Sequence, residues 1–168
     1  MSKPTIINLE DIPLNDAFPE ENSFTGPIPK KARGAKWTRI GPLIGAEKLG
    51  CALTVVPPHG TAFPYHRHTA NEEWLLVLSG TGTLRHDDEE LPLRGGDMVA
   101  LLAGSCHQVK NESDAELRYL CFSTLLYPEI TEYPDSGKVM SVPVPDRRKG
   151  HITRLADRRP YWDGETLE

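Results

Sequence analysis

Two histidines and two glutamates lie close together in the stretch PYHRHTANEE, directly before the apolar run WLLVL. If the stretch is extended, His66 and His68 point to the same side, because side chains alternate between faces along a strand. Glu73 opens the next run, EWLLVLS, where its carboxylate can supply a hard oxygen ligand opposite the two imidazoles. Charged groups beside an apolar strand are costly unless they have a partner, and a bound metal ion would be such a partner.

A third histidine, His107, follows a Gly-Ser turn in GGDMVALLAGSCHQVKN and begins another strand-like run. Three imidazoles and one carboxylate suit a divalent first-row metal such as Fe, Mn, Ni or Zn. We therefore predict one divalent metal ion per chain, bound by His66, His68, Glu73 and His107. An octahedral ion held in this way would keep two coordination positions open, and catalysis by a metal needs open positions.

The elements that must position these residues are short. Proline and glycine, 15 and 14 residues, interrupt the chain often, and no segment carries an apolar stripe of helical period and length. Many short strands separated by turns predict an all-β sandwich or barrel. The predicted strands are 36–40, 49–56, 73–79, 81–86, 89–93, 97–102, 107–111 and 116–124.

Both ends of the chain differ from this middle part. Residues 1–35 are rich in proline, asparagine and acid, and they predict an arm that lies along a surface or is disordered. Residues 143–168 interleave basic and acidic side chains and predict a tail, of which Tyr161 and Trp162 are candidates for docking on a partner subunit. The predicted organisation is therefore an N-terminal arm, a barrel over residues 36–142 and a C-terminal tail.

Composition excludes several classes of protein. The 168 residues are enough for one domain with a proper core. A net charge of −5, from 19 basic and 24 acidic residues, argues against a nucleic-acid partner. The N-terminus has no apolar core of signal-peptide length, no run is long enough to span a membrane, and the three cysteines form no C-x-x-C pair. We expect a cytoplasmic protein with no membrane partner.

Two motifs make the chain resemble the cupins, which are single-domain double-stranded β-helix (jelly-roll) barrels. The first cupin motif, G-x5-H-x-H-x3,4-E-x6-G, is matched by Gly60, His66, His68, Glu73 and Gly80. The second, G-x5-P-x-G-x2-H-x3-N, is matched by Gly96, Gly104, His107 and Asn111, with Leu102 where proline is usual. The resemblance covers about residues 45–125, and it implies the cupin fold and the same four metal ligands. More loosely, the whole chain resembles bacterial single-domain cupins described as sugar-phosphate-isomerase-like or of unknown function.

Glu72 is the competing candidate for the carboxylate ligand. It leaves seven residues before Gly80, where the cupin motif has six. Its side chain would also point to the face opposite that of Glu73. We expect Glu72 to be solvated or to lie in an interface.

The metal site and the resemblance together predict a metal-dependent enzyme that acts on a small molecule. A redox-active Fe or Mn would give a dioxygenase. An ion without a redox role would polarise a carbonyl or enediolate, and it would give an isomerase or epimerase of a sugar or sugar phosphate, or a decarboxylase. The alternative is a non-catalytic cupin module that binds a small ligand, because one fold hosts many functions. The sequence assigns no catalytic side chain beyond the metal ligands.

Both faces of EWLLVLS are apolar, with Leu75 and Val77 on one face and Trp74, Leu76 and Leu78 on the other. The outer face of a solvated barrel wall would instead be polar. The pattern predicts that another sheet, the N-terminal arm or a second subunit covers this face. We predict a homodimer.

Overall fold

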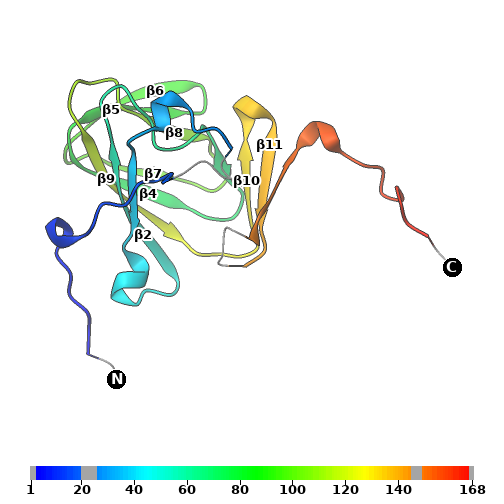
Figure 1. Ribbon diagram of the computed structural model, residues 1–168, viewed down its shortest axis with the longest axis horizontal. Helices are drawn as coiled ribbons and strands as arrows, with labels where there is room; N and C mark the ends of the chain where they lie inside the picture. The colour runs from blue at the N-terminus through cyan, green and yellow to red at the C-terminus, as the bar shows by residue number, and fades with distance from the viewer. Residues whose placement is uncertain (1–2, 20–25, 145–148, 167–168) are drawn as a thin grey trace.

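The computed structural model describes residues 3–19, 26–144 and 149–166, and almost all of its regular structure is β (Figure 1). These residues contain no α-helix, and none of their helices is long and apolar enough to cross a membrane. The short 3-10 helices are η1 (Leu9–Asp11), η2 (Lys30–Ala32), η3 (Gly41–Ile44), η4 (Pro134–Ser136) and η6 (Leu155–Asp157). The strands are β1 (Lys36–Arg39), β2 (Leu49–Val56), β3 (Arg67–His68), β4 (Glu73–Ser79), β5 (Thr81–His86), β6 (Glu89–Arg94), β7 (Met98–Leu101), β8 (His107–Lys110), β9 (Leu117–Thr124), β10 (Glu129–Tyr133), β11 (Lys138–Val142) and β12 (His151–Arg154).

The strands pair into three antiparallel sheets, so the prediction of an all-β chain is confirmed. The largest sheet has the order β1-β2-β9-β4-β7, the second β12-β11-β10-β3 and the third β6-β5-β8. Each strand that the sequence pattern predicts is present, with ends within one residue of the prediction. Non-consecutive neighbours such as β2 and β9 show that distant segments pair, as a jelly-roll requires.

The core lies between the inner faces of the sheets. Along β4 the inward positions are Glu73, Leu75 and Val77, of which the last two are almost fully buried. Leu84 of β5, Leu117 of β9 and their apolar neighbours join them in one buried cluster. The carboxylate of Glu73 therefore lies at one end of an apolar stripe that continues along the inner face of β4 into the core.

The N-terminal segment covers part of the outer face of the five-stranded sheet. Ile12 is 7% exposed and packs with Leu53 and Leu120 in a second apolar cluster on that face. Asp16 forms a β-bridge with Lys36 of β1, and their side chains form an ion pair at 2.6 Å. The arm therefore covers the edge strand β1 as well as part of the outer face. An uncovered edge strand presents unpaired backbone N–H and C=O groups that can pair with another chain.

The rest of this outer face, on β4 and the edge strand β7, stays exposed. Trp74 stacks on Phe122 of β9 with the ring centroids 4.1 Å apart, yet 39% of Trp74 is accessible. Met98 and Leu78 are 63% and 37% exposed. The apolar outer face predicted from EWLLVLS is thus covered by the arm at one side and open at the other.

The C-terminal part of the chain adds a sheet that the sequence pattern does not indicate. β10 pairs with β3 on one side and with β11 on the other, and β12 pairs with β11. Because β12 comprises His151–Arg154, regular structure continues beyond residue 142, where the predicted barrel ends. Beyond β12 the chain extends away from the barrel, with the exposed rings of Tyr161 and Trp162 in edge contact (Figure 1).

Candidate metal centre

A backbone bridge joins the two histidine-bearing segments. The N–H of His66 donates to the carbonyl of His107 at 3.1 Å, and the N–H of His107 donates to the carbonyl of His66 at 2.8 Å. Residues that exchange both bonds lie directly opposite one another in an antiparallel pair, with side chains on the same face. The imidazole rings are accordingly neighbours, with their centroids 4.5 Å apart.

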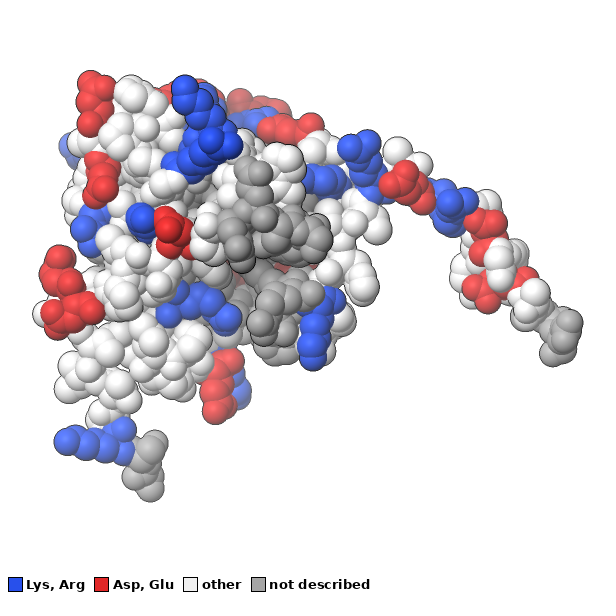
Figure 2. Space-filling view, viewed as in Figure 1, with Lys and Arg blue, Asp and Glu red and all other residues white. Residues whose placement is uncertain are grey.

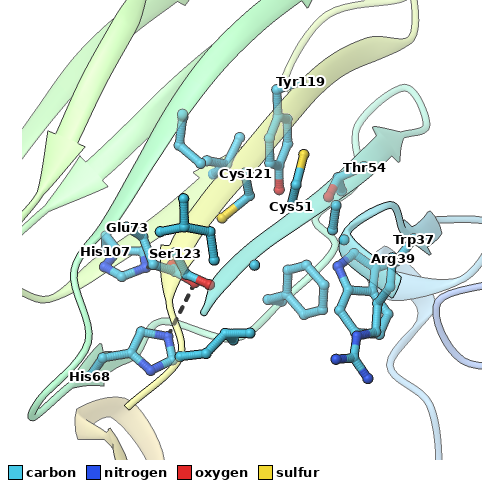
Figure 3. A pocket seen from close by; sticks show the side chains of 18 of the residues that line it. Trp37, Arg39, Cys51, Thr54, His68, Glu73, His107, Tyr119, Cys121 and Ser123 are labelled. Atoms are coloured by element: carbon cyan, nitrogen blue, oxygen red, sulfur yellow. Dashed lines mark hydrogen bonds and ion pairs between the residues drawn. The ribbon is translucent and has the colours of Figure 1, made fainter. Parts of the chain in front are cut away.

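The other two residues reach the same place from different strands. His68 is held in β3, where it lies opposite Thr131 of β10. Glu73 is the first residue of β4, and its side chain points toward those of His68 and His107 (Figure 3). One ligand atom from each of His66, His68, Glu73 and His107 can be chosen so that all lie within 4.8 Å of one another. The structure thus brings together all four residues that the sequence proposes as ligands.

Glu72, the competing candidate, lies outside this group. Its side chain is exposed, and its backbone N–H donates to the hydroxyl of Thr124 at 3.1 Å. The alternation of faces along the strand explains the difference, since adjacent residues point to opposite sides of the sheet.

Each histidine of the cluster has an acceptor at its Nδ1 atom. His66 Nδ1 lies 2.8 Å from the carbonyl oxygen of Pro64, and His107 Nδ1 lies 3.3 Å from that of Ser105. His68 Nδ1 lies 3.2 Å from Oε1 of Glu129. Carbonyl and carboxylate oxygens only accept, so Nδ1 carries the proton in each ring, and the lone pair of a neutral ring lies on Nε2.

The Nε2 atoms face a second acceptor. Oε2 of Glu73 is 3.2 Å from His107 Nε2, and Oε1 is 3.6 Å from His68 Nε2. A neutral imidazole has one N–H and cannot donate to acceptors on both sides. A cation bound between the Nε2 lone pairs and the carboxylate would satisfy all of these groups, so the donor set fits a divalent metal ion.

The electrostatics of the cluster favour metal binding as well. Burial, helped by the neighbouring imidazoles, lowers the pKa of His66 to about 3, so its ring is neutral at pH 7. Burial alone would raise the pKa of Glu73, but the close contact of its carboxylate with His107 and the influence of the other two histidines outweigh burial and hold that pKa at about 2. Metal ligands must be deprotonated, and both groups are in that form.

Glu129 is a part of the site that the sequence analysis missed. Its carboxylate is buried, 5% exposed, and lies between His68 and the side-chain amide of Asn71, which donates to Glu129 Oε2. The amide of Asn71 also donates to the carbonyl of Leu126 at 3.0 Å and thereby fixes the loop that leads into β10. The sequence could have indicated Glu129 only through the alternation of Glu129 and Thr131 with other residues in a strand-like run. That alternation does not show which of the two faces points inward.

Two glycines and an asparagine of the motifs have structural roles. Gly80 has φ +85°, and a Cβ atom there would collide with the backbone oxygen of Glu116, so the turn after β4 requires glycine. Gly104 has φ +88°, and its N–H donates to the carbonyl of His68 at 2.7 Å. Asn111 is buried, and its amide donates to three backbone carbonyls, those of Val56, Pro57 and Ala115. These contacts hold the loops around the histidines in place.

A cavity of about 540 Å³ opens from the cluster into the barrel. His68, Glu73 and His107 lie on one side of it, and Trp37 and Arg39 lie on the other (Figure 3). Its walls are formed in part by Leu75, Val109 and Cys121, and the hydroxyls of Tyr119 and Thr54 project into it (Figure 3). A volume of this size, apolar walls and a few polar groups are typical of sites for small molecules.

Comparison with known proteins agrees with this fold. Residues 52–123 match the family model of the Cupin domain. Two curated relatives are an "Oxalate-binding protein" of Thermotoga maritima, 26% identical over 69 residues, and an uncharacterized protein of Methanocaldococcus jannaschii, 29% identical over 76 residues. These matches cover 41% and 45% of this chain, and they span only 57% and 60% of the relatives' own lengths.

Solved structures resemble a larger part of the chain. A sugar phosphate isomerase from a cupin superfamily, from Silicibacter pomeroyi, is 24% identical with a TM-score of 0.78, and the match covers 95% of this chain and 98% of that one. A protein of Acidithiobacillus ferrooxidans with the provisional name sugar phosphate isomerase is 25% identical with a TM-score of 0.68, over 75% and 80% of the two chains. The predicted cupin double-stranded β-helix is confirmed.

The contact between Glu129 and His68 generates a prediction. Glu129→Gln removes the negative charge that orients the imidazole and raises its basicity, so we expect the affinity for Mn²⁺ or Zn²⁺ to fall by about 10- to 100-fold. Glu132→Gln on the same strand is the matched control, because Glu132 pairs with Arg67 on the opposite face. Competition with a chelating dye measures both affinities, and equal losses in the two variants would contradict the role of Glu129.

Proposed function

This chain carries a cupin domain, and from that premise we propose that it is a metal-dependent enzyme acting on a small molecule, an isomerase or epimerase of a sugar or sugar phosphate. The observation that carries the proposal is the cluster of three histidines and one glutamate at the end of a cavity of about 540 Å³. The names of the two similar solved structures support the choice of reaction class.

In this proposal His66, His68, Glu73 and His107 hold one divalent ion, Fe, Mn, Ni or Zn. The ion would supply Lewis acidity toward a carbonyl or hydroxyl oxygen of the substrate, and Fe or Mn would also supply redox chemistry. The carboxylate of Glu73 is the one anionic group in this set, so it lowers the net charge of the site. The apolar walls of the cavity exclude water and strengthen every electrostatic contact inside it.

Tyr119 can contact a substrate, because its hydroxyl projects into the cavity (Figure 3). Burial and the nearby Cys121 raise its pKa well above the usual range of a phenol, so the hydroxyl stays protonated and can donate a hydrogen bond. Thr54 Oγ1, beside it, is buried and has no hydrogen-bond partner among the described residues. Two hydroxyls in the cavity can orient the oxygens of a sugar without adding charge.

Two other functions would use the same site. A dioxygenase with Fe or Mn would use the same ligands, since the donor set does not distinguish the two reactions. A non-catalytic module that binds a small ligand is favoured by the name of the relative from Thermotoga maritima, an oxalate-binding protein. Catalytic turnover is the property that separates the enzyme from the module.

The proposal includes a homodimer, formed through the open part of the outer face at Trp74, Leu78 and Met98. These side chains are on the paired strands β4 and β7, and Trp74 also stacks on Phe122. Figure 2 shows basic and acidic side chains interspersed over the face that it views, without separation into regions of one sign. A cytoplasmic location and the lack of a nucleic-acid partner remain predictions from composition.

The first prediction of this proposal concerns the metal. Purified protein is expected to hold about one divalent ion per chain, measured by mass spectrometry of the metals, and His68→Ala combined with His107→Ala should abolish binding because only two ligands remain. His59→Ala combined with His151→Ala is the control, since neither residue belongs to the cluster. Stoichiometric metal in the double variant of the cluster would refute the assignment.

The second prediction concerns the charge of Glu73. Glu73→Gln keeps the shape and an oxygen donor, so much of the metal should remain, whereas turnover should fall by about 10²- to 10³-fold, the usual size of an electrostatic effect at a reacting centre. Glu72→Gln, an adjacent exposed carboxylate, should leave both unchanged. The assay uses each variant loaded with the same ion and a panel of sugar phosphates and aromatic diols. If wild type turns over none of these with Fe, Mn, Ni or Zn, the binding module becomes the preferred function.

The third prediction concerns assembly. Sedimentation velocity at micromolar concentration should show a dimer, and Met98→Lys should shift it toward monomer by placing a charge in an apolar contact. Ile6→Lys is the control, because Ile6 is 90% exposed on the arm and outside this patch. A monomeric wild type would refute the dimer and leave this patch as an exposed apolar surface beside the part that the arm covers.

A further inference from the structure

Arg39 lies on the wall of the cavity that faces the histidine cluster. It is the last residue of β1, and in the pairing with β2 it lies opposite Ala52, while Trp37 lies opposite Thr54. Arg39 and Trp37 therefore share the face of the sheet that lines the cavity. Figure 3 shows both side chains across the cavity from His68, Glu73 and His107.

The guanidinium of Arg39 has no hydrogen-bond or ion-pair partner among the residues that the structure describes. Other basic side chains near the barrel are in ion pairs, such as Lys36 with Asp16, Arg67 with Glu132 and Arg85 with Asp135. Within the described part of the chain, the side chain of Arg39 makes no hydrogen bond or ion pair, and its backbone pairs with Ala52 in the sheet. Among the described residues that line the cavity it is the one lysine or arginine, and Glu73, on the opposite side, is the one carboxylate.

An unpaired arginine at a surface is often only solvated, but here three further features act together. The guanidinium is at the rim of a continuous cavity, its neighbour Trp37 adds a flat apolar surface with an N–H donor, and Thr54 inside the cavity has an unused hydroxyl. A planar guanidinium presents paired donors that match the oxygens of a carboxylate or a phosphate. Arg39 therefore favours a ligand that carries a carboxylate or a phosphate at the end near this rim.

We propose that the cavity binds a small molecule that carries an oxyanion, a carboxylate or a phosphate monoester, at the end held by Arg39. The opposite end of the molecule presents oxygens to the histidine cluster, and this second half of the inference rests on the proposed function. A cavity of about 540 Å³ is large enough for a five- or six-carbon molecule with both groups. Neutral sugars, which lack the oxyanion, are discriminated against by the loss of a charge-assisted hydrogen bond.

The test measures binding by calorimetry, with D-ribose 5-phosphate, succinate and neutral D-ribose as probes. Wild type, Arg39→Ala, Arg39→Lys and the control Arg154→Ala, an exposed arginine of β12 outside the cavity, are each used with Mn²⁺ and after removal of metal. We expect Arg39→Ala to weaken binding of an anionic probe by about 10- to 100-fold. Arg39→Lys should recover part of it, because lysine keeps the charge and loses the fork of donors.

The three probes distinguish the two sources of the oxyanion. Loss of ribose 5-phosphate binding alone assigns a phosphate monoester, and loss of succinate binding alone assigns a carboxylate. Binding to wild type should also weaken between about 0.05 M and about 0.5 M KCl, since Arg39 is exposed at the rim and its charge is screened. Arg154→Ala should match wild type in every arm.

The inference is overturned if neither anion binds wild type at about 1 mM, the upper end of ordinary substrate affinities. It is overturned equally if Arg39→Ala binds the anions within twofold of wild type, or if ribose binds as well as its phosphate. Failure of the proposed function has a different signature. In that case Mn²⁺ does not load, while the anions still bind the metal-free protein in a manner that depends on Arg39.

Discussion

The pair of backbone hydrogen bonds between His66 and His107 is the interaction on which the site depends. It connects the segment before β4 to the start of β8, two parts of the chain that belong to different sheets. Without this bridge His107 would still be held in β8 by its pairing with β5, but no backbone contact would hold His66 opposite it with the ring centroids 4.5 Å apart. Two backbone hydrogen bonds fix the distance between the two residues and the direction of their side chains more precisely than side-chain packing alone.

A second constraint acts through the outer hydrogen bonds of the imidazoles. The acceptors of His66 and His107 are neutral carbonyls, whereas that of His68 is the carboxylate of Glu129. The three rings are therefore not equivalent, since a carboxylate makes the ring it contacts more basic and a stronger ligand than a carbonyl does. A metal ion held by these four residues would therefore meet three imidazoles of unequal donor strength.

Most of the barrel and the candidate ligands could be predicted from sequence because their signals are local. Alternation along EWLLVLS places Glu73, Leu75 and Val77 on one face, and fixed spacings place His66 and His68 together. The prediction that these residues bind a metal, and that the chain dimerises, stays a prediction. β3 could not be recognised as a strand, because two residues carry no periodic pattern and their pairing is decided by the distant β10. The inward position of Glu129 and the rim position of Arg39 depend on the same long-range register.

The attachment of the N-terminal arm to β1 links two properties of the protein. The N–H of Trp37 donates to the carbonyl of Asn15, and the N–H of Ala17 donates to the carbonyl of Ala35. The ring of Phe18 packs edge-on against Phe63, which also contacts Trp37. Trp37 is at once a docking surface for the arm and a wall of the cavity. A molecule bound in the cavity against Trp37 would therefore lie one side chain away from the arm. If its binding restricts Trp37, it would also make the arm harder to detach, and a firmly attached arm would strengthen binding by the same amount.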